Sequence, residues 1–184
     1  DLTLKLGVSR NILREALKSL QAVGLIEIKV GDGMYVSDFD YSSVVTHISF
    51  ALSRNEQHMS HFIEARLITE VGALDLVVSR IEDSEIQKLD ELNHALEFAD
   101  SVETAAELDL EFHKALLATS GNPVVSEFGG FLGQFFMEAR RFVGKEAKVH
   151  TAKGHRELIQ AIKDRDAERA RALMRSHILT WEDR

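Results

Sequence analysis

The sequence predicts a mainly α-helical protein in two parts, a small module that ends in a two-stranded hairpin and a larger antiparallel helix bundle. Three observations predict this class. The chain of 184 residues contains a single proline, so few positions interrupt a helix. Apolar residues recur at helical spacing along most of its length. A glycine-bounded turn between two alternating segments lies near the start, over residues 25–36.

The composition sets limits on the class of protein. Hydrophobic residues make up 45% and charged residues 28%, which is typical of a soluble globular chain. The absence of cysteine excludes disulfides and thiolate metal sites and fits a reducing compartment, so we expect a cytoplasmic protein. The longest uncharged stretches, 41–53 and 128–137, are shorter than the roughly 20 apolar residues that span a bilayer, so we expect no membrane association. No targeting segment is visible, and the chain starts inside its first predicted domain.

The first elements are two short helices separated by a turn. Residues 2–6 are interpreted as the end of a helix that stops at Gly7, and Ser9 is placed to cap the next helix, over 11–23. Gly24 ends this second helix. Its apolar residues share one face at helical spacing, namely Ile12, Ala16, Leu17, Leu20 and Val23.

A hairpin follows the second helix. Residues 25–30 alternate as a strand, Gly31-Asp32-Gly33 predicts a tight turn, and residues 34–36 form the return strand. Helix, turn, helix and two-stranded wing together predict a partial winged helix-turn-helix without its first helix. We expect this DNA-binding domain over residues 1–38, a linker over 39–43 and a helical domain over 44–184.

Charge is unevenly divided between the two parts. Residues 1–36 contain five Lys or Arg and four acids, a net charge of +1. Since the whole chain has a net charge of −8, the remaining residues carry −9. Such asymmetry suits a small DNA-facing module on an acidic body. The second helix of a helix-turn-helix enters the major groove, where its first turn meets bases and phosphates. The predicted DNA contacts are Ser9, Arg10, Asn11 and Arg14; the alternative is that Arg10, Arg14 and Lys18 form a solvated helix face.

This first module resembles the winged helix of the GntR family of bacterial regulators. The resemblance covers the whole of residues 1–36. The matching segments, which occur in the same order as in the family, are residues 6–10, 13–17, 20, 24–26 and 31–36. It implies that Arg10 and Arg14 contact operator DNA and that Gly33 lies at the wing tip. Family members have another helix before this point. Asp32 stands where many members carry a basic or neutral residue, which weakens the case for a phosphate contact by the wing.

The rest of the chain is predicted to be helical. Short polar breaks separate segments at about 42–53, 58–81, 83–99, 103–119, 123–143, 147–164 and 166–182. Because the connections are short, neighbouring helices run roughly antiparallel, which predicts a six- or seven-helix bundle. Residues 128–136 are rich in Phe and Gly and are interpreted as core or dimer interface.

Four polar residues on apolar helix faces predict a metal site. Asp109 and His113 share a face at i, i+4, and His155 and His177 each lie among apolar residues at helical spacing. A buried carboxylate and buried imidazoles need partners, and a divalent cation supplies one to all four. Three nitrogens and one oxygen suit zinc first, and also nickel, manganese or iron. The alternatives are hydrogen-bonded core histidines and an Asp109 that only pairs with His113.

The helical part resembles the FCD effector domain of the FadR-type branch of GntR regulators. The resemblance spans roughly 44–180 and rests on Asp109-x-x-x-His113, the Ser-Gly-Asn-Pro segment at 120–123, His155 and His177. It implies that one Asp and three His bind a metal that helps to hold a carboxylate effector. Arg66, in Glu64-Ala65-Arg66, and Asn122 match positions near the effector cavity, although Asn122 also suits a helix cap.

These expectations combine into a regulator that binds an inverted-repeat operator as a homodimer and responds to a small carboxylic acid at the metal. The resemblance implies a repressor, since repression relieved by a ligand is the commoner arrangement in the family. Two alternatives stay open. One is a metal-dependent enzyme that uses the three-His, one-Asp site, with Glu70 or Glu111 as a base. The other is a purely structural metal without an effector.

Overall fold

The computed structural model describes residues 2–37, 58–139 and 145–180. The chain divides into two compact units, Asp1–Ile48 and Ser49–Arg184. The predicted linker at 39–43, the domain boundaries beside it and the predicted helix at 42–53 lie outside the described residues.

The first unit contains the predicted helix-turn-helix and wing. It consists of α1 (Leu2–Leu6), α2 (Arg10–Ala22), β1 (Ile26–Lys29) and β2 (Gly33–Val36). The Ser9 hydroxyl accepts a hydrogen bond from the backbone N–H of Ile12 and so caps α2. The strands are antiparallel, with Ile26 opposite Val36 and Lys29 opposite Gly33. Gly31 has a φ of +81°, which the reversal between the strands requires and which favours glycine.

The apolar side chains of this unit are exposed. Among the described residues 2–37 none is buried, and Ile12 on the apolar face of α2 is 60% exposed. Isolated exposed apolar residues are common, but a continuous apolar helix face is normally covered by another polypeptide segment.

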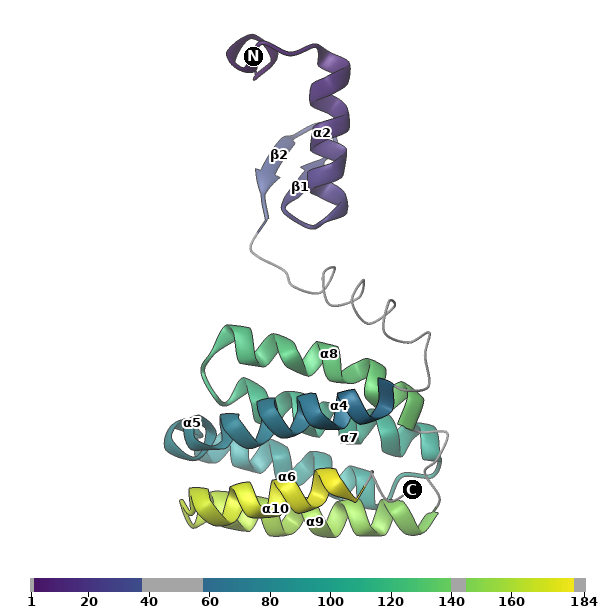
Figure 1. Cartoon of the computed structure of the whole chain (residues 1–184), viewed down its shortest axis with the longest axis vertical. Helices are drawn as coiled ribbons and strands as arrows, with labels where there is room; N and C mark the ends of the chain where they lie inside the picture. Colours follow the sequence, from purple (N-terminus) through teal and green to yellow (C-terminus); the bar gives the residue numbers. More distant parts are fainter. Residues whose placement is uncertain (1, 38–57, 140–144, 181–184) are drawn as a thin grey trace. The chain divides into compact units, whose positions relative to one another are not determined.

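The second unit is a helix bundle, as predicted. Its elements are α4 (His58–Arg66), a π-helical turn η1 (Leu67–Val71), α5 (Gly72–Arg80), α6 (Asp83–Glu97), α7 (Val102–Ala118), α8 (Pro123–Ala139), α9 (Lys145–Lys163) and α10 (Ala167–Leu179). Helix α7 packs against α6 and α8, α9 packs against α6, and α10 packs against α9 (Figure 1). The predicted segments agree with these helices to within a few residues wherever both can be compared.

A continuous apolar core lies between the helices of the bundle. It draws side chains from every helix from α4 to α10, including the fully buried Leu74, Val77, Phe112, Leu117, Ile162, Ala170, Met174 and Ile178. Polar contacts join helices across it. The side-chain amide of Asn93 on α6 donates to the carbonyl of Ala152 on α9. The Arg165 guanidinium donates to the carbonyls of Val78 and Ile81, where α5 ends.

One feature of the bundle differs from the prediction. The sequence predicts an unbroken helix over 58–81, but the helix widens into the π turn η1 between α4 and α5. Arg66 directly precedes this turn and Glu70 lies in it. Both side chains are buried, with 0% of Arg66 and 1% of Glu70 exposed. Such turns are rare and are often found at functional sites. Apolar periodicity does not reveal it, because the helix continues on both sides.

Candidate metal centre

Three helices of the bundle bring the four predicted metal ligands together. Asp109 and His113 lie on successive turns of α7, His155 lies in α9 and His177 lies in the last turn of α10. All four side chains are buried. One potential ligand atom from each residue lies within 4.8 Å of the others. The structure thus gathers into one cluster residues that are up to 68 positions apart in sequence, from 109 to 177.

The atoms at the centre of this cluster belong to one carboxylate and the Nε2 side of the imidazoles. Oδ1 of Asp109 lies 3.2 Å from Nε2 of His155 and 3.5 Å from Nε2 of His113. The rings themselves are close: the centroids of His155 and His177 are 4.7 Å apart and those of His113 and His177 are 5.3 Å apart.

The donor set fits a divalent cation. Three of the central atoms are buried and make no hydrogen bond with the described part of the chain: Asp109 Oδ1, His155 Nε2 and His177 Nε2. Leaving a buried polar atom without a partner costs about 1–3 kcal/mol each, so several in one place indicate a missing common partner. Three imidazole nitrogens and one carboxylate oxygen are ligands that zinc and related metals accept.

The protonation of the cluster favours metal binding. Burial lowers the pKa of His177 well below its usual range, and the neighbouring His155 and His113 lower it further. Burial likewise lowers the pKa of His155, against the opposing effect of Asp109. Burial would raise the pKa of Asp109, but close contacts with His113 and His155 outweigh it and keep the carboxyl ionised. Near neutral pH His155 and His177 are therefore neutral and Asp109 is a carboxylate, the forms that bind metals.

A buried ion pair lies on the outer side of His113. Arg66 donates from Nε to Oε1 of Glu70 at 2.5 Å, and Nδ1 of His113 contacts Oε2 of the same carboxylate. Nη2 of Arg66 is also 3.0 Å from Nε2 of His113. Burial would raise the pKa of Glu70, but the charges of Arg66 and His113 lower it to about 2. Burial would lower the pKa of His113, but the contacts with Glu70 and Asp109 together outweigh it and raise that pKa.

Comparison with known proteins identifies the family. Residues 61–180 match the FCD domain, and residues 1–36 match the bacterial regulatory proteins of the gntR family. The chain belongs to the GntR family of regulators with an FCD domain.

Individual relatives agree with this membership. The transcriptional regulator LutR of Bacillus subtilis is 27% identical over 96% of this chain and 84% of its own length. The galactonate operon transcriptional repressor of Escherichia coli is 26% identical over 92% of this chain and 78% of its own length. A solved GntR structure from Streptococcus agalactiae is 27% identical, with a TM-score of 0.76 over 100% of this chain and 86% of that one. The metal-free FCD domain of TM0439 shares the fold, with 23% identity and a TM-score of 0.59 over 70% of this chain and 91% of that one.

Membership settles the class of activity. The chain is a DNA-binding transcriptional regulator and not an enzyme, which overturns the metal-dependent enzyme as an alternative. Metal binding is common among FCD domains, and the Asp109–His113–His155–His177 cluster lies inside the matched region. Among the helices that the structure describes, none has the length and apolar character to cross a membrane.

Two residues of the FCD domain that the sequence analysis missed lie against the histidines of the cluster. The Phe112 ring stacks on His155, with centroids 3.7 Å apart and planes 7° apart. Gly154 leaves room for His177, because a Cβ at position 154 would lie 3.1 Å from Nδ1 of that ring. In the sequence, Phe112 is one of several apolar residues on the same helix face as Asp109 and His113, so the pattern predicts only a core residue. The position of Gly154 in the middle of α9 could have indicated a special role, because glycine destabilises a helix interior and is usually kept there for packing or function.

The other predicted site residues are divided between the two units. Arg66 lies beside the candidate metal centre, through its contact with His113. The side-chain oxygen of Asn122 accepts from the backbone N–H of Val124 at 3.0 Å and so caps α8. In the first unit, Ser9 caps α2 and the predicted DNA contacts on that helix are exposed, as Arg10, Asn11 and Arg14. Gly33 opens β2, one position after the turn.

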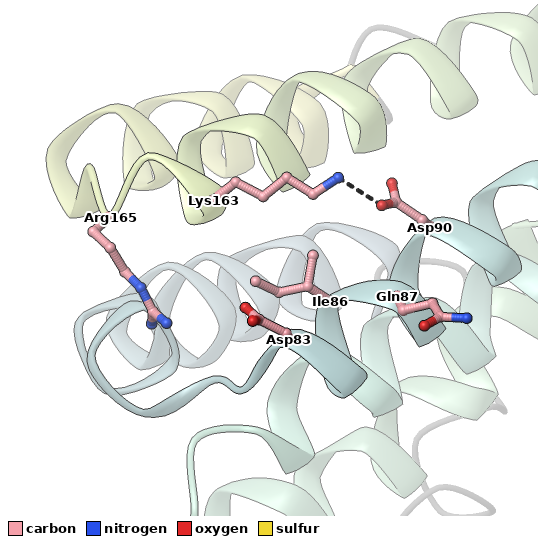
Figure 2. Close-up of a pocket in the computed structure, with 6 residues that line it drawn as sticks. All are labelled: Asp83, Ile86, Gln87, Asp90, Lys163 and Arg165. Atoms are coloured by element: carbon pink, nitrogen blue, oxygen red, sulfur yellow. Dashed lines mark hydrogen bonds and ion pairs between the residues drawn. The ribbon is translucent and has the colours of Figure 1, made fainter.

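A separate hollow on the surface of the FCD domain lies between α6 and the junction of α9 and α10 (Figure 2). Its lining consists of Asp83, Ile86, Gln87, Asp90, Lys163 and Arg165. Lys163 is paired with Asp90 at 2.6 Å, and Arg165 donates to two backbone carbonyls. Both cations that line this hollow therefore already have partners.

Proposed function

We propose that the chain is a repressor whose FCD domain holds a divalent metal ion, zinc first, on Asp109, His113, His155 and His177. The observation that carries this proposal is the meeting of four buried potential ligand atoms within 4.8 Å. A cation bound there satisfies the unpartnered Asp109, His155 and His177 atoms and leaves the apolar core around them intact.

A small carboxylic acid is the proposed effector. A bound divalent metal supplies a Lewis-acidic position for a carboxylate oxygen. Arg66, fully buried beside His113, supplies a guanidinium that suits the same group. The name of one relative, the galactonate operon repressor, refers to a sugar acid, which agrees with this class of effector. Asn122 is a further proposed contact, through the part of its amide that does not cap α8.

Operator binding is assigned to the winged helix. The proposed contacts are Ser9, Arg10, Asn11 and Arg14 on α2 and Gly33 in the wing. The exposed side chains at positions 10, 11 and 14 lie at the start of the helix that enters the major groove in this class of module. A homodimer matches an inverted-repeat operator. In each subunit the DNA-binding module covers residues 1–38, the linker 39–43 and the effector domain 44–184. Effector binding shifts the population between states that bind DNA and states that do not.

Thermal unfolding with metal and acids tests the effector proposal. The zinc-loaded chain is heated with and without each of a panel of small carboxylic acids, and a chelator-treated sample is the control. An acid that binds only the folded state adds about 2.7 kcal/mol at a hundredfold excess over its Kd. We expect at least one acid to raise the Tm and the chelator to abolish that rise. If the chelator lowers the Tm but no acid raises it, the metal is structural and the effector proposal is wrong.

A pair of histidine variants tests the metal ligands. His155→Ala removes a proposed ligand from α9, whereas His150→Ala removes an exposed histidine from the same helix. We expect His155→Ala to lose stoichiometric zinc and His150→Ala to retain it, as measured by metal analysis after dialysis. Equal zinc content in the two variants would place the metal elsewhere.

A further inference from the structure

Glu70 is a buried carboxylate that neither the DNA-binding site nor the set of proposed ligands uses. It lies in the π turn η1, is 1% exposed, and contacts two residues of the metal centre with its two oxygens. Oε1 accepts from Nε of Arg66 at 2.5 Å, and Oε2 contacts Nδ1 of His113. Burying a charge is costly unless it is paired, so both contacts are needed to keep Glu70 ionised in the core.

The contact with Glu70 determines which nitrogen of His113 carries the proton. A carboxylate only accepts hydrogen bonds, so in a neutral ring this contact favours the proton on Nδ1, the nitrogen that faces Oε2. In the neutral ring Nε2 then keeps its lone pair. That atom is on the side of Asp109 Oδ1, 3.5 Å away, and of the donor Nη2 of Arg66. A metal-binding histidine whose second nitrogen donates to a carboxylate is a common arrangement, because it fixes the tautomer and the direction of the ring.

The same carboxylate also fixes the arginine. The guanidinium of Arg66 can donate but cannot accept, and its Nε is bound to Glu70. The rest of the group is thereby held with Nη2 at 3.0 Å from the His113 ring. The π turn begins directly after Arg66 and contains Glu70, whose two oxygens contact Arg66 of α4 and His113 of α7.

We propose that Glu70 is the positioning residue of the metal centre: it holds His113 in the Nδ1-protonated form with Nε2 directed to the metal, and it orients Arg66 for the effector. This inference rests on the proposed function, since it presumes that His113 is a ligand. It adds a residue that binds neither metal nor effector and sets the geometry for both.

Nitrogen NMR of the zinc-loaded wild-type chain tests the tautomer without any substitution. In protein labelled with ¹⁵N-histidine, long-range proton–nitrogen correlations distinguish a protonated, a free and a metal-bound ring nitrogen. We expect His113 to show a protonated Nδ1 and a zinc-bound Nε2. A zinc-bound Nδ1, or a protonated Nε2, would overturn the proposal.

A pair of glutamine variants tests the effect on affinity. Glu70→Gln keeps the size of the side chain but replaces one acceptor oxygen by a donor amide, so it cannot accept from both Arg66 and His113. Glu64→Gln makes the same change at an exposed position of α4. Partners of metal-bound histidines typically contribute 10–100-fold to metal affinity, so we expect Glu70→Gln to weaken zinc binding by roughly that factor and Glu64→Gln to leave it unchanged. The absorption spectrum of the cobalt-loaded chain should change only in Glu70→Gln.

The outcomes separate this inference from the proposed function. A wild-type chain that binds no zinc overturns both. If the wild type binds zinc, His155→Ala does not, and Glu70→Gln binds as tightly as Glu64→Gln, then only the role of Glu70 is wrong. If Glu70→Gln does not fold, the tautomer of His113 in the wild-type chain still decides the question.

Discussion

Replacing Gly154 with alanine is expected to weaken metal binding without destabilising the metal-free fold. Glycine in a helix interior costs about 0.8–1.0 kcal/mol relative to alanine, so α9 on its own gains from the change. The added Cβ, however, lies 3.1 Å from Nδ1 of His177 and 3.8 Å from Cγ of that ring. The ring must move by a few tenths of an ångström to relieve this contact.

The size of the effect on metal binding follows from that displacement. Metal–ligand distances vary by only about 0.2 Å around their preferred values, so a ligand displaced by more than this binds less well. We expect about tenfold weaker zinc binding, which is about 1.4 kcal/mol. In the absence of metal, the repulsion offsets part of the helix gain, and the free energy of unfolding should rise by between 0 and about 1 kcal/mol.

The assay combines zinc competition against a chromophoric chelator with urea unfolding in excess chelator. Gly72→Ala is the matched control, since Gly72 has helical dihedral angles and a Cβ there meets no atom within 4 Å. It should gain stability and bind zinc like the wild type. The reasoning is refuted if Gly154→Ala binds zinc as tightly as Gly72→Ala, or if it destabilises the metal-free chain by more than about 1 kcal/mol.

Three further predictions concern pH, packing and capping. In excess chelator, the free energy of unfolding should fall as the pH drops below 6.5. The reason is that His155 and His177 take up protons in the unfolded chain, whereas burial lowers their pKa in the folded chain. The two histidines together give a slope of up to about 2.7 kcal/mol per pH unit. His113, with its raised pKa, adds no slope there, since its contribution is complete below pH 6.5 and is lost at higher pH. Urea titrations at pH 7, 6 and 5 measure this, and equal stabilities would contradict it. Phe112→Leu should cost about 1–2 kcal/mol and weaken zinc binding through the lost stacking on His155; calorimetry that finds zinc affinity unchanged would show that the stacking does not position the ring. Asn122→Ala should lower stability by about 1 kcal/mol through the lost cap, and a simultaneous loss of acid binding in the thermal assay would show that Asn122 also contacts the effector.

The sequence was sufficient to predict the buried cluster of one Asp and three His, because each member violates the pattern of its own helix. Asp109 and His113 interrupt an apolar face at i, i+4, and His155 and His177 do the same on their helices, so each must find a partner in the core. The hairpin and the cap at Ser9 follow from local turn chemistry, which does not depend on the rest of the fold.

The contacts around the ligands could not be predicted in this way. Periodicity shows which face of a helix is buried but not which residues of other helices meet it. Arg66 and Glu70 were visible as a pair at i, i+4, yet their contact with His113, more than 40 positions later, depends on how α4 and α7 pack. The role of Gly154 likewise depends on the position of the His177 ring on α10.

The π turn between α4 and α5 also has a consequence for chain length. Its hydrogen bonds join residues five apart instead of four, so the segment Leu67–Val71 contains one residue more than a plain α-helix would need. Loss of a single residue here would close the turn into an ordinary helix and leave the two flanking helices intact, while Glu70 would be rotated away from His113. Related domains that differ by one residue at this point would therefore keep the bundle and lose the carboxylate that we propose positions His113.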